Sequence, residues 1–74
     1  MITDKNRIDF IIDYENGTLN DVDTLHLFKH LIKNGMAWSL QGHYGRTATS
    51  LIDNEYLLAN GDFNQEKLED IGIL

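Results

Sequence analysis

The sequence has no cysteine and no proline among its 74 residues. Because cysteine is absent, neither a disulfide framework nor a thiolate metal site can reinforce the fold. No apolar run approaches the roughly 18 residues that suggest a membrane span, and no basic-then-apolar leader is visible. We therefore expect a cytoplasmic protein without a membrane partner. The apolar share of 42% is ordinary for a globular domain and too high for a disordered tail.

Carboxylates are also absent from the middle of the chain, between Asp23 and Asp53. Counting Lys and Arg against Asp and Glu gives −4 for residues 1–23, +3 for 24–52 and −5 for 53–74. Either the basic middle is a working surface, or the acidic ends fold back onto it, and the sequence leaves both open. The net charge of −6 disfavours nonspecific attraction to nucleic acid, which we do not expect as a partner.

The length predicts one helical domain over residues 1–74, near the lower limit at which a hydrophobic core holds a fold alone. At this size, self-association is a natural way to bury more apolar surface. A homodimer and a monomer are both compatible with the sequence.

Apolar residues recur at helical spacing, which predicts a mainly α, small compact domain of three to five helices. In the first helix, Ile8, Ile11 and Ile12 are expected on one side, with Phe10 and Tyr14 nearby. A turn through Gly42 and Gly45 is expected before the fourth helix. The expected helices run from an Asp4 cap to about Asn16, from Asn20 to Gly35, over 36–41, from Gly45 or Thr47 to about Asn54, and from Asn64 through Leu68 and Ile71.

Residues 56–63 are open to two interpretations. If the preceding helix continued to Ala59, Glu55 would fall on its buried side, which is costly without a partner. We therefore favour a helix end near Asn54, followed by one short β-hairpin with Asn60-Gly61 as a two-residue turn. The alternative is a helix that continues to Ala59, with Gly61 as its C-terminal glycine.

Neither a metal site nor catalysis is indicated strongly. His26 and His30 have the spacing of zinc ligands on a helix, with Asp23 on the same side and His43 in reach, but the pattern is more typical of a solvated helix face. Serine and threonine residues lack a marked base with an orienting acid. We predict no metal, no cofactor and no enzymatic activity.

The densest run of aromatic and hydrogen-bonding side chains lies between residues 38 and 47. Its candidate partner-binding residues are Trp38, Gln41, His43, Tyr44 and Arg46. The alternative is structural: Trp38 and Tyr44 complete the core, and Arg46 pairs with Asp53 or Glu55.

A helix-turn-helix arrangement over 36–57 is a second functional hypothesis, with a wing-like hairpin after the second helix. The reading helix, 47–54, would carry no Lys or Arg beyond Arg46 at its entrance, so it offers little for phosphate neutralisation. A third hypothesis is an acidic DNA mimic that inhibits a nucleic-acid enzyme through the carboxylates of 1–23 and 53–74.

From Leu25 to Tyr56 the chain resembles a group of small, uncharacterised proteins encoded by bacteriophages. The motif that carries the resemblance is Ala37-Trp38-x-Leu40-Gln41-Gly42-x-Tyr44-Gly45-Arg46-Thr47-Ala48. In those proteins glycine often stands at the position of Glu55. The resemblance implies a phage product in a bacterial cytoplasm, and it brings no activity with it. With it, we expect a non-catalytic protein that binds a host or phage protein and modulates it.

Overall fold

The computed structural model describes residues 2–3, 5–40 and 42–72, and it confirms a compact, mainly helical fold. In these residues no helix is both long and apolar enough to cross a membrane. The described helices are α1 (Arg7–Glu15), α2 (Asp21–Lys33), α3 (Met36–Ser39), α4 (Gly42–Asp53) and α5 (Gln65–Asp70).

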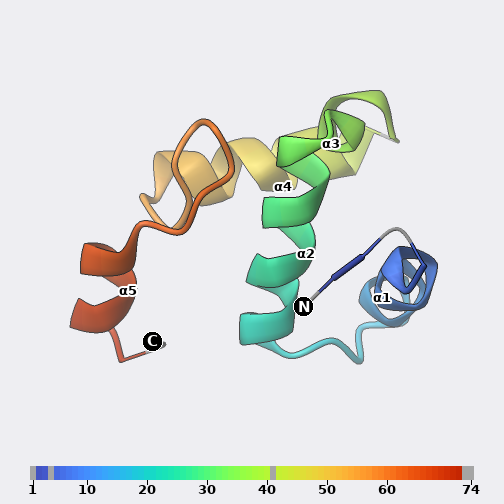
Figure 1. Cartoon of the computed structure of the whole chain (residues 1–74), viewed down its shortest axis with the longest axis horizontal. Helices are drawn as coiled ribbons and strands as arrows, with labels where there is room; N and C mark the ends of the chain where they lie inside the picture. Colours follow the sequence, from blue (N-terminus) through green and yellow to red (C-terminus); the bar gives the residue numbers. More distant parts are fainter. Residues whose placement is uncertain (1, 4, 41, 73–74) are drawn as a thin grey trace.

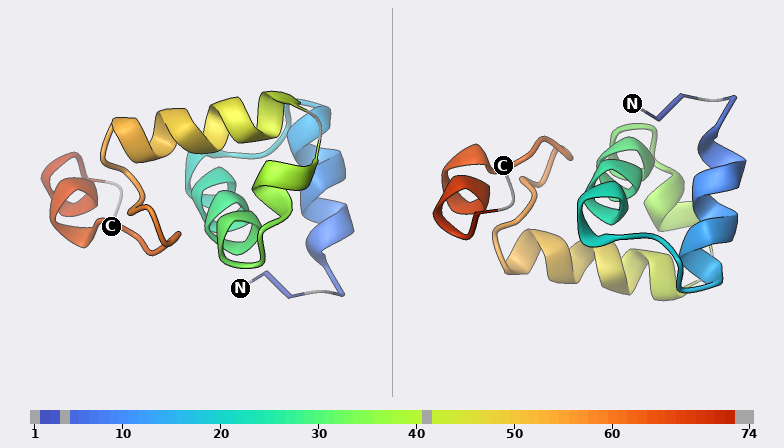
Figure 2. Two further views of the ribbon diagram at one scale, coloured as in Figure 1. Left: turned by 90° about the horizontal axis from the view of Figure 1, so that it is seen from above. Right: turned by 90° about the horizontal axis from the view of Figure 1, so that it is seen from below.

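Helix α2 is the centre of the fold, as the views in Figure 2 show. Its start matches the prediction, because the Asn20 side chain accepts a hydrogen bond from the Asp23 amide at 2.8 Å. Helices α1 and α3 contact it directly, and α4 packs on α3. Helix α2 contributes more buried residues to the core than any other described helix: Leu25, Leu27, Phe28, Leu31 and Ile32.

Helix α1 is turned differently from the prediction. Phe10, Ile11 and Tyr14 pack against the core, whereas Ile8 and Ile12 remain 60% and 50% exposed. The Tyr14 ring meets Phe28 edge to face at 5.3 Å. Aromatic rings bury more apolar area than isoleucine does, so their burial decides the rotation of the helix. The expected Asp4 cap lies outside the described residues.

Helix α4 begins at Gly42, three to five residues before the predicted start, so the expected turn through Gly42 and Gly45 is wrong. The reason is the spacing of Tyr44 and Ala48, which are four residues apart and both buried. A helix that includes both positions places them on one inward face. Their burial outweighs the cost of a glycine inside a helix, which is about 0.5–1 kcal/mol relative to alanine.

The end of α4 confirms the prediction that the helix stops near Asn54. The Glu55 amide donates to the Ile52 carbonyl and the Tyr56 amide to the Leu51 carbonyl, both at 3.0 Å. These two bonds form a Schellman motif, whose central residue adopts the left-handed conformation that glycine favours. Glu55 occupies that position with φ +66°. Among the described residues, Glu55 is the one other than glycine whose φ is positive.

We expect Glu55→Gly to raise the free energy of unfolding by about 0.5–1 kcal/mol, because it removes the left-handed backbone cost of a residue with a Cβ. Urea denaturation followed by circular dichroism measures the change. Glu55→Ala is the matched control, since it removes the same charge but keeps the backbone cost. An equal gain in both variants would assign the effect to charge and contradict the backbone explanation.

After α4, the chain forms a hairpin-like loop, shown in orange in Figure 1. Leu57 and Phe63 make a single antiparallel bridge, and the Leu58 amide donates to the Asp62 carbonyl at 2.8 Å. The Gly61 amide donates to the Leu58 carbonyl at 2.8 Å, and Gly61 has φ +94°. This is a three-residue loop and not the predicted two-residue turn. The alternative helix to Ala59 is excluded.

Asn64 caps α5 as predicted, accepting from the Lys67 amide at 3.4 Å. Leu68 is fully buried, whereas Ile71 lies beyond the helix and is exposed.

Candidate functional site

Trp38 lies on the surface, with 52% of its area exposed. Helix α3 has only four residues, and Ala37 takes its inward position with no exposed area. The indole is therefore left on the outer side of the helix. The structural alternative, in which Trp38 completes the core, is wrong.

A shallow hollow of about 380 Å³ lies beside Trp38. We call this hollow the outer groove; its lining residues are Trp38, Gly45, Arg46, Thr49, Ser50 and Asp53. Except for Trp38 they all come from α4, at spacings of one, three and four that place them on one face. Because this face carries small side chains, the α4 backbone can be approached closely next to the indole.

The outer groove has a positive and a negative end. Arg46 and Asp53 are seven residues apart on α4, about 10 Å along the helix axis. In the described residues no ion pair joins Arg46 to Asp53 or to Glu55, so the predicted internal pairing is wrong. Both charged side chains are exposed. They are available to a partner with the opposite charge order.

Tyr44 points the other way, into the core, and is only 3% exposed. Its hydroxyl donates a hydrogen bond to the Glu15 carboxylate of α1. Burial, and secondly this hydrogen bond, raise the pKa of Tyr44 well above the usual tyrosine value. Of the two aromatic residues in the predicted binding set, Tyr44 is therefore the one that belongs to the core.

His43 also faces α1. Its ring centroid is 4.2 Å from that of Tyr44, and its Nε2 is 3.6 Å from Glu15 Oε1. The Tyr14 hydroxyl lies 3.4 Å from Thr47 Oγ1. We call these five residues, from α1 and α4, the α1–α4 cluster. It fastens the start of α4 to the end of α1 and so fixes the outer groove on the opposite side.

The predicted binding residues are thus divided by the structure. Trp38 and Arg46 meet at the outer groove, His43 and Tyr44 belong to the α1–α4 cluster, and Gln41 lies outside the described residues. Apart from Arg46, sequence reasoning missed the α4 residues of the groove, because it looked for the binding surface in a loop before the helix. The signal was the spacing of Gly42, Gly45, Arg46, Thr49, Ser50 and Asp53, which follows one face of a helix that starts at Gly42.

The histidines do not gather into a metal site. Within the described ranges, no three His, Asp or Glu side chains lie close enough together to hold a metal ion. His26 packs edge to face on Phe63, with ring centroids 4.9 Å apart. Among the described residues, the acidic ends reach the basic middle where Asp62 pairs with Lys33 and where Glu15 approaches His43.

The comparisons with known proteins identify a family and no function. No curated protein and no solved structure is significantly similar to the chain. One family model matches residues 4–72, which is nearly the whole sequence. The chain therefore belongs to the family described as "Domain of unknown function (DUF7417)".

Proposed function

We propose that this protein is a non-catalytic binding module that engages a protein partner through the outer groove. On the resemblance of its Ala37–Ala48 motif, we propose further that it is a phage product that acts on a host or phage protein in the bacterial cytoplasm. The observation that carries the proposal is the half-exposed Trp38 beside Arg46, which lacks an ion-pair partner in the described part of the chain.

The composition of the groove supports a protein partner. Tryptophan and arginine are enriched at the centres of protein interfaces and dominate their binding energy. A chain of 74 residues has little apolar area with which to stabilise its core. Leaving half of its only tryptophan in water costs stability, and this cost is recovered when a partner covers the indole.

Gly45 gives a second, independent indication. A Cβ at this position would lie 3.5 Å from the Ala37 carbonyl oxygen and 3.8 Å from Trp38 Cε3, which is ordinary contact. Alanine therefore fits, and it would make a better helix. Glycine is not needed here for the fold. Because it has no side chain, it leaves the α4 backbone accessible at the base of the outer groove.

The charge of α4 does not favour the helix-turn-helix hypothesis. Arg46 is its single Lys or Arg, and Asp53 lies on the same outward face. A helix that reads DNA ordinarily relies on several Lys or Arg side chains that contact phosphates. A protein partner fits a face with one cation and one carboxylate better than a DNA backbone does.

Affinity capture followed by mass spectrometry tests the proposal. The wild-type protein and a Trp38→Ala/Arg46→Ala variant serve as baits in infected bacterial cells. We expect one protein to be enriched by the wild type and lost with the variant, while both baits show the same helical circular dichroism. A partner retained equally by both baits would place the binding surface elsewhere. Enrichment of DNA-bound material that disappears after nuclease treatment would favour the helix-turn-helix hypothesis.

A further inference from the structure

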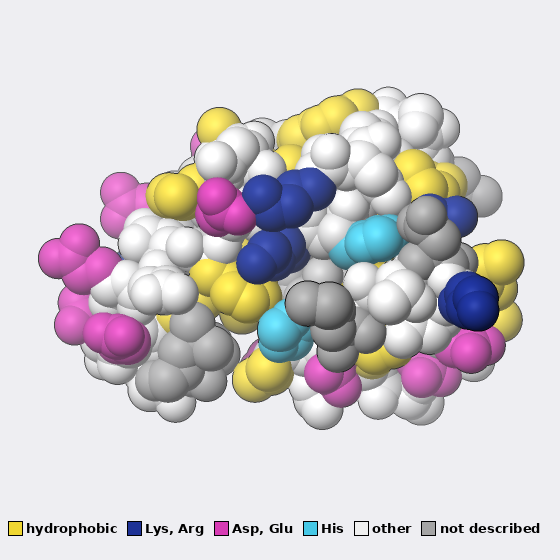
Figure 3. All heavy atoms as spheres, viewed as in Figure 1, with side chains coloured by type: hydrophobic (Ala, Val, Ile, Leu, Met, Phe, Trp, Pro, Cys, Tyr) yellow, Lys and Arg dark blue, Asp and Glu magenta, His cyan; other side chains and the backbone are white. Residues whose placement is uncertain are grey.

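A second hollow, separate from the outer groove, lies along α2. Its volume is about 340 Å³, within the range of small-ligand sites. We call it the basic hollow; its lining residues are Ile2, His26, Lys29, His30 and Lys33. The four from α2 follow the spacing of one helix face, and no carboxylate is among the described lining residues. Figure 3 shows Lys and His side chains gathered near the middle of this face of the molecule.

Placing two lysines four residues apart on one helix is unfavourable, because like charges at this spacing repel. Lys29 is held by an aromatic ring, with its Nζ 4.6 Å from the centroid of Phe63. This contact fixes the ammonium but does not neutralise its charge, and Asp62, whose carboxylate also attracts Lys29, is paired with Lys33. The two ammonium groups and the single carboxylate of Asp62 leave a net positive charge at this place, in a protein of net charge −6.

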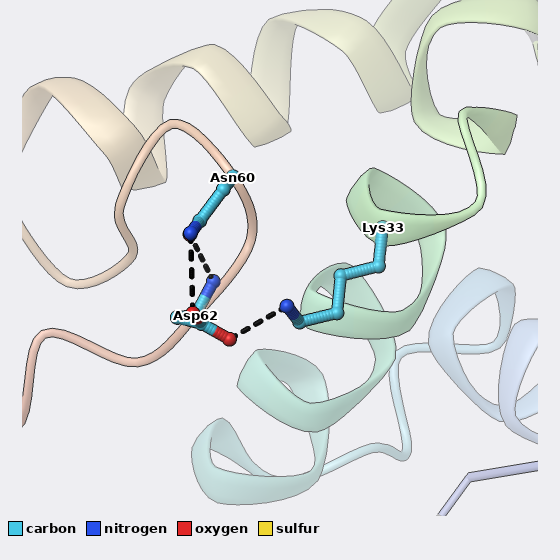
Figure 4. A network of polar contacts seen from close by, with 3 residues as sticks. All are labelled: Lys33, Asn60 and Asp62. Atoms are coloured by element: carbon cyan, nitrogen blue, oxygen red, sulfur yellow. Dashed lines mark hydrogen bonds and ion pairs between the residues drawn. The ribbon is translucent and has the colours of Figure 1, made fainter.

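The protein's own carboxylate already uses one of these cations. Asp62 Oδ1 lies 2.6 Å from Lys33 Nζ, and Figure 4 shows how Asn60 orients the carboxylate from the loop. The Asn60 side chain donates to Asp62 Oδ2 at 3.1 Å and accepts from the Asp62 amide at 2.9 Å. The hydrogen bond from Lys33, more than other contacts, lowers the pKa of Asp62. An oxyanion is therefore accepted at the edge of the hollow.

From this geometry we infer that the basic hollow binds a compact anion that carries one or two phosphate groups. Lys29 and Lys33 are the charged donors, and Asp62 competes with the ligand for Lys33. An extended polyanion fits less well, because Asp and Glu side chains lie toward both ends of this face (Figure 3). The inference is independent of the outer groove and of the proposed protein partner.

Titration with inorganic phosphate and pyrophosphate, followed by amide chemical shifts in NMR at constant ionic strength, tests the inference. We expect saturable shifts at residues 26–33, larger affinity for pyrophosphate, and at least a fivefold weaker affinity in Lys29→Gln. Asp62→Asn is expected to bind at least threefold more tightly, because it releases Lys33. Lys67→Gln, which removes the same charge from α5, is the matched control and should bind like the wild type.

Three outcomes would overturn the inference. One is linear, unsaturable shifts, and another is an equal loss of affinity in Lys67→Gln, which would indicate general charge attraction. The third is tighter binding of a hexaglutamate peptide or a DNA duplex than of pyrophosphate. Trp38→Ala should leave pyrophosphate affinity unchanged, so the failure of this inference is distinguishable from failure of the outer groove as a partner surface.

Discussion

Replacing Tyr44 by alanine is expected to lower the free energy of unfolding by about 3–5 kcal/mol, the range for removing a buried aromatic ring. The ring is almost wholly buried between α1 and α2. Its centroid lies 5.6 Å from that of the Tyr14 ring and 6.1 Å from that of the Phe28 ring. A domain of this length has a total stability of only about 4–11 kcal/mol, so the variant should be largely unfolded at moderate temperature. Chemical denaturation monitored by circular dichroism measures the loss.

Tyr44→Phe separates the ring from its hydroxyl. It keeps the packing but removes the hydrogen bond to Glu15, and we expect a loss of about 1–2 kcal/mol. The loss should be absent when Glu15 is already replaced by alanine, because the bond then has no acceptor. A loss below 1 kcal/mol in Tyr44→Ala would contradict the assignment of Tyr44 to the core.

The raised pKa of Tyr44 adds a pH dependence to this prediction. The folded protein holds the phenolic proton more tightly than the unfolded chain does. The stability that this contributes is fully present below the unfolded tyrosine pKa of about 10 and is lost as pH rises above it. The wild type should therefore lose more stability than Tyr44→Phe between about pH 9.5 and 11.

Trp38→Ala is expected to weaken partner binding by at least thirtyfold, about 2 kcal/mol, as for a central tryptophan of an interface. Because the indole is only half-buried in the free protein, the cost to folding should be smaller, about 1 kcal/mol. Titration calorimetry with the captured partner gives the affinity, and thermal unfolding gives the stability. The loss of binding free energy should exceed the loss of folding free energy.

Ile12→Ala is the matched control for this variant, since Ile12 is an apolar residue of α1 with 50% of its area exposed. It should lose a comparable amount of stability and keep its affinity for the partner.

Gly45→Ala is expected to show the opposite combination. It should stabilise α4 by about 0.5–1 kcal/mol while weakening binding, because the new methyl group fills the floor of the outer groove. If the wild type and all three variants bind the partner with equal affinity, the partner surface does not lie at the outer groove.

Much of the fold follows from local sequence signals. Asn20 and Asn64 cap helices as expected, and the five buried residues of α2 recur at helical spacing along the sequence. These signals are local because a cap or a helix face depends on residues within four positions. The stop of α4 was also predictable, from the cost of burying Glu55.

The errors arise where packing between helices overrides local preference. Glycine at positions 42 and 45 indicated a turn, but burial of Tyr44 and Ala48 extends α4 through both. Packing of Tyr14 against Phe28 and Tyr44 turns α1 so that Tyr14 faces inward and Ile8 faces water. No local pattern distinguishes an inward from an outward Trp38 on a helix of four residues. That Trp38 lies beside the outward face of α4 could therefore be read only from the structure.

The most direct test is whether the partner covers the indole of Trp38. It is the single tryptophan of the chain, so 5-fluorotryptophan labelling gives one ¹⁹F NMR signal, whatever tryptophans the partner contains. In the free protein the signal should move between H₂O and D₂O, as expected for an exposed ring. On adding the captured partner, we predict that the signal shifts and loses this solvent effect. A complex that forms while the signal keeps its position and its solvent effect would contradict the account.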